Sequence, residues 1–308
     1  MTLAFVFPGQ GSQSVGMLNA LAAEQPLVKE TFAEASAALG YDLWSIVEQG
    51  PADKLNQTVV TQPAMLAAGV AVYRVWEKLG GARPAAMAGH SLGEYTALVC
   101  AGSMAFADAV KLVADRGRFM QEAVPAGAGA MAAILGLDDP VVIDLCREAA
   151  GGEVLAAVNF NSPGQVVIAG SASAIGRAVV LAKEKGAKRA LPLPVSVPSH
   201  CALMHPAAER LRQRLKEIDI AAPAVPVIHN YHVRRETTAD GIREALVRQV
   251  ESPVRWVETV KKLEADGATR IIECGPGRVL AGLNKRIVAS AETGAIADPK
   301  SIAEALAR

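Results

Sequence analysis

The chain has 308 residues, of which 51% are hydrophobic and 20% are charged, with 31 basic and 31 acidic side chains. This length and composition are typical of a compact globular protein with two folding units, or with one domain that carries a smaller inserted one. A net charge of zero provides no overall field that would attract nucleic acid or an anionic membrane, so neither is expected as a partner.

The cysteines and the N-terminus predict where the protein works. Cys100, Cys146, Cys201 and Cys274 form no CxxC pair and no metal-ligand spacing with the five histidines, which predicts a reducing cytoplasm and no metal site. The N-terminus has no basic flank and is typical of a strand rather than of a signal peptide. The longest apolar stretch, 65–73, is shorter than the roughly 18 residues that span a bilayer, so no membrane anchor is expected.

The first part of the chain predicts helices and strands in alternation. In order, these are a strand at the N-terminus, helical spacing from Gly16 to about Leu39, a helix that starts at Thr61-Gln62-Pro63 and stops near Gly80, a strand at 84–88, a helix at 94–99 and a helix at 105–123. The glycine-rich segment 125–129 then interrupts the pattern.

The middle of the chain has a different order. It predicts a strand at 130–135, a helix at 138–149, strands at 154–160 and 166–169, a helix at 173–185 and a strand at 188–193. This βαββαβ order indicates a ferredoxin-like subdomain inserted at 128–195.

The last part alternates again, and predicts a helix at 205–218, a strand at 225–229, two helices within 240–266 and a strand at 269–273. Alternation of this kind indicates a mostly parallel sheet covered on both faces. We therefore predict an α/β catalytic domain built from 1–127 and 196–308.

The sequence Gly89-His90-Ser91-Leu92-Gly93 is a G-x-S-x-G motif between a predicted strand and a predicted helix. In that context the motif forms a sharp turn that exposes the serine at the carboxyl ends of the strands. Ser91 is the predicted nucleophile, and the backbone N–H of Leu92 is the predicted donor to an oxyanion. Outside this context, the motif also occurs by chance in glycine-rich chains.

A serine hydroxyl needs a neighbouring base, and the chain offers five histidines. His200 lies in a loop between the inserted unit and the next helix, where functional side chains are often presented. His205 competes, but it lies at the start of that helix. His229 and His232 flank a strand end, and His90 adjoins the serine and is expected to shape the turn. Spacing alone leaves His200 as one choice in two.

The loop Gly9-Gln10-Gly11 after the first strand lacks the spacing of a dinucleotide-binding loop and the lysine of a P-loop, which disfavours nucleotide binding. It can instead bring the Gln10 backbone N–H beside Ser91 as a second oxyanion donor. An ordinary glycine turn at a strand end is the alternative.

A series of short blocks runs in order along nearly the whole chain. The blocks are Phe7-Pro8-Gly9-Gln10-Gly11-Ser12-Gln13, Gly89-His90-Ser91-Leu92-Gly93-Glu94-Tyr95, Arg116-Gly117-Arg118-Phe119-Met120-Gln121, Asn161-Ser162-Pro163-Gly164-Gln165, Pro198-Ser199-His200-Cys201 and Gly275-Pro276-Gly277. Together they resemble the malonyl-CoA:acyl carrier protein transacylase family of fatty acid synthesis. The resemblance implies a hydrolase-like α/β domain with an inserted ferredoxin-like subdomain.

The resemblance also implies roles for individual residues. It assigns Ser91 as nucleophile and His200 as base, the backbone N–H groups of Gln10 and Leu92 as the oxyanion hole, Arg116 as the clamp for the malonyl carboxylate, and the backbone carbonyl of Gln249 as the group that orients the histidine. These assignments describe a dyad rather than a Ser-His-Asp triad. Without the resemblance, Arg116 would be a solvated helix charge paired with Asp115 or Glu122.

Malonyl-CoA and an acyl carrier protein are the implied partners, and no cofactor is implied because coenzyme A leaves as a product. Since the carrier is expected to be acidic, we predict that Arg278, Lys285 and Arg286 contribute to docking, although a solvated helix face explains these charges equally well. Two other functions remain open, namely a serine thioesterase with the same turn and a non-catalytic carrier-binding module. Ser199 precedes the base where modular-synthase relatives often carry an aromatic residue, so exclusion of methylmalonyl is not predicted.

Overall fold

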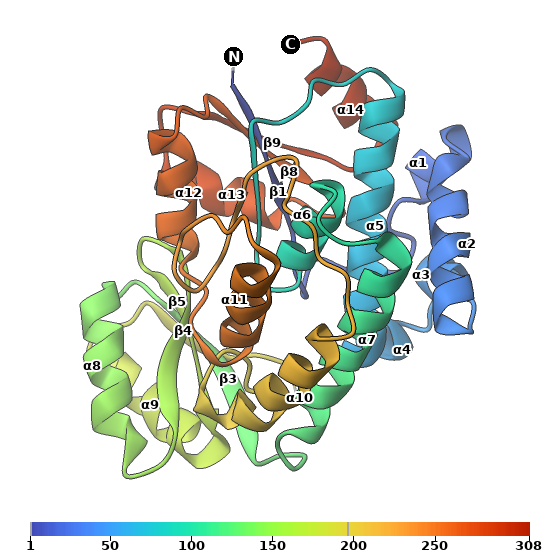
Figure 1. Cartoon of the computed structure of the whole chain (residues 1–308). Coiled ribbons are helices and arrows are strands. Elements are labelled where there is room, and N and C mark those ends of the chain that lie inside the picture. The colour runs from blue at the N-terminus through green and yellow to red at the C-terminus, as the bar shows by residue number, and fades with distance from the viewer. Residues whose placement is uncertain (1, 196) are drawn as a thin grey trace.

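The computed structural model describes residues 2–195 and 197–308 and contains two sheets, A and B (Figure 1). Met1 and Ser196, the first residues of the two segments predicted for the larger domain, lie outside the described residues. The two sheets have different topologies and separate hydrophobic cores. The α/β fold class is confirmed, whereas the predicted domain boundaries at 128 and 195 remain predictions.

Sheet A is parallel throughout, with strand order β7-β2-β1-β8-β9. Its strands are β1 (Leu3–Phe7), β2 (Ala86–Gly89), β7 (Val227–Ile228), β8 (Arg270–Cys274) and β9 (Glu292–Ile296). Alternate side chains of β1 enter opposite cores, with Phe5 and Phe7 on one face and Ala4 and Val6 on the other. Both faces are therefore buried, as expected for a parallel sheet.

Helices cover both faces of sheet A. The face of Phe5 packs against α5 (Thr58–Lys78), α6 (Gly93–Cys100) and α7 (Phe106–Glu122), and the opposite face against α12 (Trp256–Ala265) and α13 (Val279–Ile287). The remaining helices around this sheet are α1 (Asn19–Glu24), α2 (Leu27–Leu39), α3 (Leu43–Gln49), α4 (Ala52–Leu55), the 3-10 turn η1 (Ala202–Met204), α10 (His205–Leu215), α11 (Ala239–Glu251) and α14 (Pro299–Leu306). In the described part of the chain, no helix is both long and apolar enough to cross a membrane.

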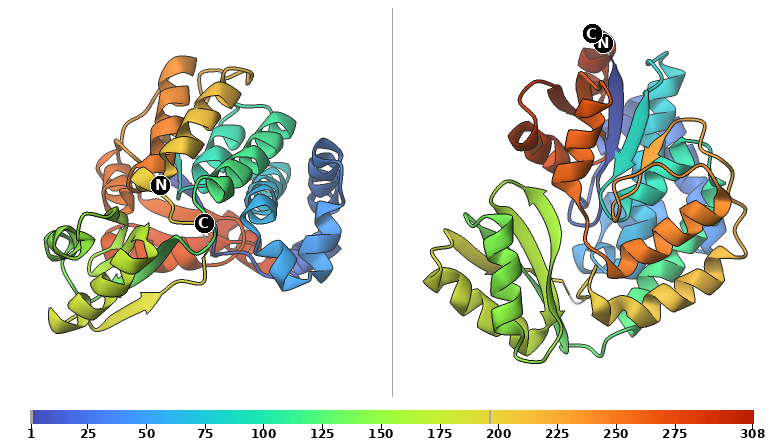
Figure 2. Two further views of the ribbon diagram at one scale, coloured as in Figure 1. Left: turned by 90° about the horizontal axis from the view of Figure 1, so that it is seen from below. Right: turned by 60° about the vertical axis from the view of Figure 1, so that its left-hand side comes forward.

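Sheet B is antiparallel, with strand order β4-β5-β3-β6. Its elements are β3 (Gly129–Leu135), α8 (Asp139–Ala150), β4 (Leu155–Ser162), β5 (Gln165–Ser171), α9 (Ala172–Glu184) and β6 (Arg189–Pro192). The predicted βαββαβ order is thus confirmed. Figure 2 shows α8 and α9 on the face of sheet B that points away from sheet A. The other face carries Met131 and Val167, which pack with Cys201 of the larger domain.

Two helix predictions were wrong in their boundaries. The segment from Gly16 to Leu39 forms two helices, because Pro26 cannot donate a backbone hydrogen bond and favours an extended residue before it. Helix α1 therefore ends at Glu24, and Gln25 is extended. The helix predicted to start at Thr61 starts at Thr58, so that Pro63 lies inside it. The Thr61 hydroxyl does not cap the helix but donates to the carbonyl of Gln57 at 3.1 Å, one turn earlier.

The pairing of β1, β2 and β7 decides which loops meet. Phe7 pairs with Gly89, and Ala88 pairs with Ile228. The carboxyl ends of these three neighbouring strands therefore lie at the same edge of the sheet. As a result the loop after β1, the turn after β2 and the segment after β7 come together there.

Candidate active site

The turn between β2 and α6 has the geometry predicted from its sequence. Ser91 has a φ of +51°, in the left-handed region that non-glycine residues seldom occupy. A Cβ atom on Gly89 would lie 1.9 Å from the carbonyl carbon of Gly93, and one on Gly93 would lie 2.0 Å from the carbonyl oxygen of Phe7. Both glycines are therefore required by close approach of backbone, and the strand, turn and helix order is confirmed.

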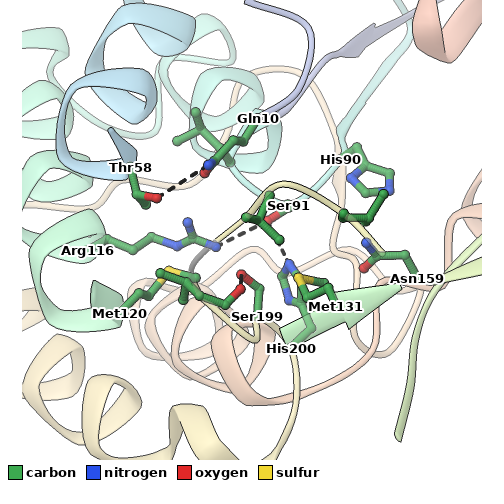
Figure 3. Close-up of a pocket in the computed structure, with 14 residues that line it drawn as sticks. Gln10, Thr58, His90, Ser91, Arg116, Met120, Met131, Asn159, Ser199 and His200 are labelled. Carbon is green, nitrogen blue, oxygen red and sulfur yellow. Dashed lines mark hydrogen bonds between the residues drawn. The ribbon is translucent and has the colours of Figure 1, made fainter. Parts of the chain in front are cut away.

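Ser91 and His200 meet although they are far apart in the sequence (Figure 3). The Ser91 Oγ atom lies 2.8 Å from Nε2 of His200, and Nδ1 of His200 lies 2.7 Å from the backbone carbonyl oxygen of Gln249. A carbonyl can only accept, so Nδ1 carries the proton and Nε2 is free to accept the proton of Ser91. The backbone N–H of His200 donates to Val250 at 3.0 Å. Both acceptors are carbonyls in the last turn of α11, which have no partner within the helix.

The other four histidines are bonded elsewhere. His90 bonds to Asn161 at 2.8 Å and His205 to Glu251 at 2.8 Å. His229 bonds to Glu94 and His232 to Glu236. Only His200, of the five, is within hydrogen-bond distance of the Ser91 hydroxyl, so geometry resolves the choice that spacing left open.

The environment of His200 keeps its imidazole neutral. Burial, and then the positive charge of Arg116, lower the pKa of His200 to about 3. A neutral imidazole can accept a proton at neutral pH. The negative end of the α11 dipole, at the carbonyls of Gln249 and Val250, favours the imidazolium that forms when the proton is transferred. The Gln249 carbonyl lies at Nδ1 of His200, where an aspartate lies in a Ser-His-Asp triad, and its role in orienting the imidazole remains a prediction.

Gln10 and Leu92 line the pocket that contains Ser91. Among the described residues, neither backbone N–H has a hydrogen-bond acceptor, whereas the N–H of Ser91 donates to Asn230 Oδ1 at 2.7 Å. The side chain of Gln10 is held by Thr58 at 3.3 Å. This arrangement fits the two predicted oxyanion donors, whose role remains a prediction.

Arg116 projects from α7 into the same pocket and is only 2% exposed (Figure 3). Its guanidinium donates to Gln62 Oε1 at 2.8 Å, to Gln249 Oε1 at 2.9 Å and to Ser91 Oγ at 3.3 Å. All three acceptors are neutral. Within the described residues no carboxylate lies within 4.0 Å of this guanidinium, and its Nε has no partner.

The alternative reading of Arg116 as a surface charge is wrong. Asp115 pairs with Arg118 at 2.8 Å, and Glu122 pairs with Arg210 at 2.5 Å. A buried arginine with neutral partners retains a full positive charge, which an anionic ligand can neutralise.

Both sheets contribute to the pocket, which has a volume of about 120 Å³. Sheet B and the segment after it supply an apolar wall with Met131, Leu193 and Val195, and a polar group with Asn159. No group of three or more His, Cys, Asp or Glu side chains in the described part of the chain is arranged to hold a metal ion. The pocket therefore offers one positive charge, one activated hydroxyl and an apolar lining.

The three basic residues predicted for docking do not line this pocket. Arg278 lines a separate cavity with Glu292 and Ser301. Arg286 donates to Gln165 at 2.7 Å and so joins α13 to β5. Their part in binding a carrier protein remains a prediction.

Sequence reasoning missed three residues of the polar network. Gln62 and Glu94 are buried on α5 and α6, and Asn230 is buried just after β7. Glu94 lies in one of the blocks that carry the family resemblance, but no role was assigned to it. The signal for Asn230 was its position, because polar residues that follow a buried strand lie at the active edge of a parallel sheet.

The chain was compared with protein families and with known proteins. The acyl transferase domain family matches residues 4–300. The malonyl CoA-acyl carrier protein transacylase of Escherichia coli K12 is 61% identical over 303 residues, which cover 98% of each chain. The protein of the same name from Bacillus subtilis is 47% identical, with 97% of this chain and 95% of that one covered.

Two solved structures show the same fold. The acyl carrier protein S-malonyltransferase of Vibrio cholerae is 59% identical, with a TM-score of 0.97 and 99% of each chain covered. A malonyl-transacylase in complex with its type II PKS acyl-carrier protein is 55% identical, with a TM-score of 0.99 over 100% of this chain and 99% of that one. The chain therefore belongs to the malonyl CoA-acyl carrier protein transacylase family of acyl transferases.

Proposed function

We propose that this protein transfers the malonyl group from malonyl-CoA to the phosphopantetheine thiol of an acyl carrier protein, through a malonyl ester on Ser91, for fatty acid synthesis. One observation carries the proposal. A buried guanidinium that no carboxylate neutralises, Arg116, lies 3.3 Å from the hydroxyl of Ser91, and this hydroxyl lies 2.8 Å from a neutral histidine. The site thus combines an acyl-transfer nucleophile with a receptor for a second, anionic group on the acyl chain.

In the first half of the reaction, Ser91 Oγ attacks the thioester carbonyl carbon while its proton moves to Nε2 of His200. The N–H groups of Gln10 and Leu92 donate to the oxyanion of the tetrahedral intermediate. Collapse of the intermediate breaks the carbon–sulfur bond, and His200 returns its proton to the departing coenzyme A thiolate. A malonyl-serine ester and free coenzyme A result.

In the second half, the phosphopantetheine thiol of the carrier gives its proton to His200, and its sulfur attacks the ester carbonyl. The carbon–oxygen bond to Ser91 then breaks, and His200 returns the proton to the serine. Each half uses the same groups in opposite roles. Malonyl-CoA and the carrier are thus successive substrates at one pocket, and we propose that no cofactor takes part.

Arg116 gives the reaction its preference for malonyl. A guanidinium can donate two parallel hydrogen bonds to the free carboxylate of malonyl, an interaction that acetyl cannot make. Charge-assisted hydrogen bonds of this kind contribute about 1.5 to 3 kcal/mol. With acetyl bound, Arg116 would remain buried with its charge uncompensated, which also disfavours the shorter substrate.

We place the reaction in the cytoplasm because all four cysteines, each within the described part of the chain, are unpaired. A reducing compartment keeps thiols in this state. The carrier thiol that accepts the malonyl group also needs to be reduced.

The proposal is tested by trapping the ester. After incubation with malonyl-CoA, mass spectrometry of digested protein should find one malonyl group on Ser91, and added holo carrier protein should remove it with formation of malonyl-carrier. Ser91→Ala should carry no adduct, whereas Ser173→Ala, which removes a surface serine bonded to Glu153, should behave like the unsubstituted protein. Absence of the adduct would exclude the mechanism, and release of free malonate in place of malonyl-carrier would identify a thioesterase.

A further inference from the structure

The side chain of Asn230 bridges the turn that holds Ser91. Its Oδ1 accepts from the backbone N–H of Ser91 at 2.7 Å, and its Nδ2 donates to the backbone carbonyl of Gly89 at 2.6 Å. One amide thus joins the last residue of β2 to the nucleophile two positions later. Asn230 is fully buried, and none of the residues assigned to the chemistry supplies these bonds.

Asn230 is itself held rigidly from the far side. Its backbone N–H donates to Glu94 Oε2 at 2.8 Å, and the other oxygen of Glu94 lies 2.8 Å from Nδ1 of His229. Glu94, His229 and Asn230 are all 0% exposed. Because Glu94 lies in the first turn of α6, the strand, the turn and the following helix are all tied to the segment after β7.

The hydrogen bonds of Asn230 determine which backbone N–H groups of the turn are available to a ligand in the pocket. The N–H of His90 donates to Phe7 at 3.0 Å, and that of Ser91 is taken by Asn230, so neither is available to a ligand. The N–H of Leu92 is the next along the chain and has no acceptor among the described residues. The left-handed φ of Ser91, +51°, is what turns the chain between these two directions. Such a conformation persists only where surrounding contacts enforce it.

We propose that Asn230 is a positioning residue that holds Ser91 in its left-handed conformation and thereby aims the Ser91 hydroxyl at His200 and the Leu92 N–H at the oxyanion. The assignment deepens the proposed function and rests on it for the identity of the acyl group. The positioning of the Ser91 hydroxyl by Asn230, however, should affect the reaction of Ser91 with any acylating or sulfonylating reagent.

The first measurement removes the bridge. Asn230→Ala should lower kcat for malonyl transfer by about 10- to 100-fold with little change in KM, because small displacements of reacting groups cost rates of this order. The rate of Ser91 modification by phenylmethylsulfonyl fluoride should fall in parallel. This second readout needs no malonyl chemistry, so it tests Asn230 even if the unsubstituted protein transfers no malonyl group.

The second variant, Asn230→Asp, has a side chain of nearly the same shape, but a carboxyl oxygen replaces the amide nitrogen that donates to Gly89. An ionised carboxylate still accepts from Ser91, but its second oxygen then faces the carbonyl of Gly89 without a proton between them. Protonation restores a donor. Burial and the neighbouring Glu94 should raise the pKa of the introduced carboxyl. The other titratable or charged groups around this position come from several segments. They are His229 beside Glu94 with His232 packed on its ring, His90 next to the bridged Gly89, Arg255, whose backbone N–H donates to the Asn230 carbonyl at 3.3 Å, and His200 and Arg116 across Ser91.

The sulfonylation rate of N230D, relative to the unsubstituted protein at the same pH, should therefore rise about two- to tenfold between pH 8 and pH 5. This is the rate effect of one restored hydrogen bond, which contributes about 0.5 to 1.5 kcal/mol. Asn284→Asp is the matched control. Asn284 is equally buried and accepts from Trp256 at 3.0 Å. Within the described residues it does not line the pocket and has no hydrogen bond to the turn, which it approaches through Trp256, whose ring lies 5.5 Å from that of His90. Its relative rate should vary by less than about twofold over this range.

Near-UV circular dichroism tests whether each variant is folded, so that rates are compared only among folded proteins. If folded N230A sulfonylates at the unsubstituted rate, or if N230D and N284D share one pH profile, Asn230 does not position the nucleophile. If the unsubstituted protein reacts with the sulfonyl fluoride but transfers no malonyl group, the proposed function fails while this inference is still decided by the labelling rates.

Discussion

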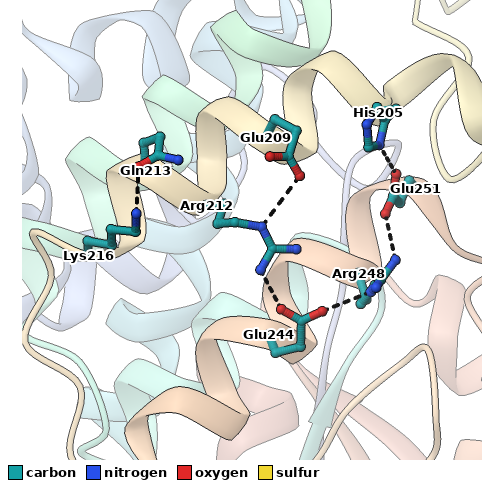
Figure 4. Close-up of polar contacts among 8 residues, drawn as sticks. All are labelled: His205, Glu209, Arg212, Gln213, Lys216, Glu244, Arg248 and Glu251. Atoms are coloured by element: carbon teal, nitrogen blue, oxygen red, sulfur yellow. Dashed lines mark hydrogen bonds and ion pairs between the residues drawn. The ribbon is translucent and has the colours of Figure 1, made fainter.

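Two networks centred on arginine occupy opposite kinds of environment in this protein. In the pocket, Arg116 is buried and its acceptors are the side chains of Gln62, Gln249 and Ser91. Between α10 and α11, Arg212 and Arg248 lie at the surface and both bond to Glu244 (Figure 4). In both networks the hydrogen-bond donor is an arginine guanidinium.

The surface network cancels its own charge. Arg248 lies 2.8 Å from Glu244 and 3.2 Å from Glu251, and His205 lies 2.8 Å from the other oxygen of Glu251. The side chains of His205 and Arg248 are 65% and 51% exposed, so water solvates whatever charge remains. The charged groups of this network therefore need no ligand to neutralise them.

The buried network uses neutral amides where the surface network uses carboxylates. The amide oxygens of Gln62 and Gln249 accept from the terminal nitrogens of Arg116, whereas its Nε has no partner in the described part of the chain. No carboxylate among the described residues lies beside this charge, and the side chain is only 2% exposed to water. The difference teaches that the fold accepts an electrostatic cost at the pocket that it does not carry in the surface network between α10 and α11. Such a cost is recovered when an anion binds.

Replacement of Arg116 should give the largest effect in this comparison. Arg116→Ala should lower kcat/KM for malonyl-CoA by about 100-fold, because loss of one partner of a buried ion pair costs about 2 to 5 kcal/mol. The value for acetyl-CoA should change far less. Arg116→Met should change the free energy of unfolding by no more than about 1 kcal/mol, because removal of an unpaired buried charge is opposed by loss of the donor to the buried oxygens of Gln62 and Gln249. A substrate panel and urea unfolding measure both, and unchanged malonyl preference would refute the assignment.

The second largest effect should be on how the reaction rate of Ser91 depends on pH. Only neutral His200 can accept the proton, and its lowered pKa of about 3 keeps it neutral well below pH 6. Sulfonylation of Ser91 should thus be nearly equal at pH 7 and pH 5, whereas a histidine with the ordinary pKa of about 6.5 would lose about 25-fold. In Arg116→Met the acid limb should move to higher pH, because the positive charge that lowers the pKa is gone. A limb near pH 6.5 in the unsubstituted protein would show that His200 is not held neutral.

Disruption of the surface network should give the smallest effect. Arg212→Ala should lower the free energy of unfolding by less than about 1 kcal/mol, and the difference should shrink as salt is added because exposed ion pairs are screened. Malonyl loading of Ser91 should stay within about twofold, since Arg212 is remote from the pocket and shares no partner with its residues. A loss of loading comparable to that of R116A would mean that the α10–α11 network supports the site.

Periodicity predicted most elements to within a few residues, and the order of strands and helices predicted both sheets. The two errors near Pro26 and Pro63 have one cause, because a proline can either end a helix or lie inside one, and local sequence does not distinguish these outcomes. The short helices α3, α4 and α14 and the C-terminal β9 were not predicted. Segments of four to eight residues carry too little periodicity to identify.

At the pocket, the nucleophile could be predicted because its chemistry requires a local pattern. The spacing of Gly89 and Gly93 around Ser91 reflects contacts within the turn itself. The base could not be singled out by spacing, because Ser91 and His200 are 109 positions apart in the sequence and a connection of this length allows any of several histidines to return to the turn.

What the sequence by itself determined is the set of elements, the sharp turn and the family to which its motifs belong, because each of these is written in short-range spacing. Tertiary structure alone decided that the side chain of Gln249 contacts both Ser91 and Arg116, that the charge of Arg116 has no carboxylate beside it within the described residues, and that Asn230 bridges the turn. The physical reason is that these contacts join strand ends and helix ends distant in the chain. Only the register of β1, β2 and β7 and the packing of α7 and α11 bring them within hydrogen-bond distance.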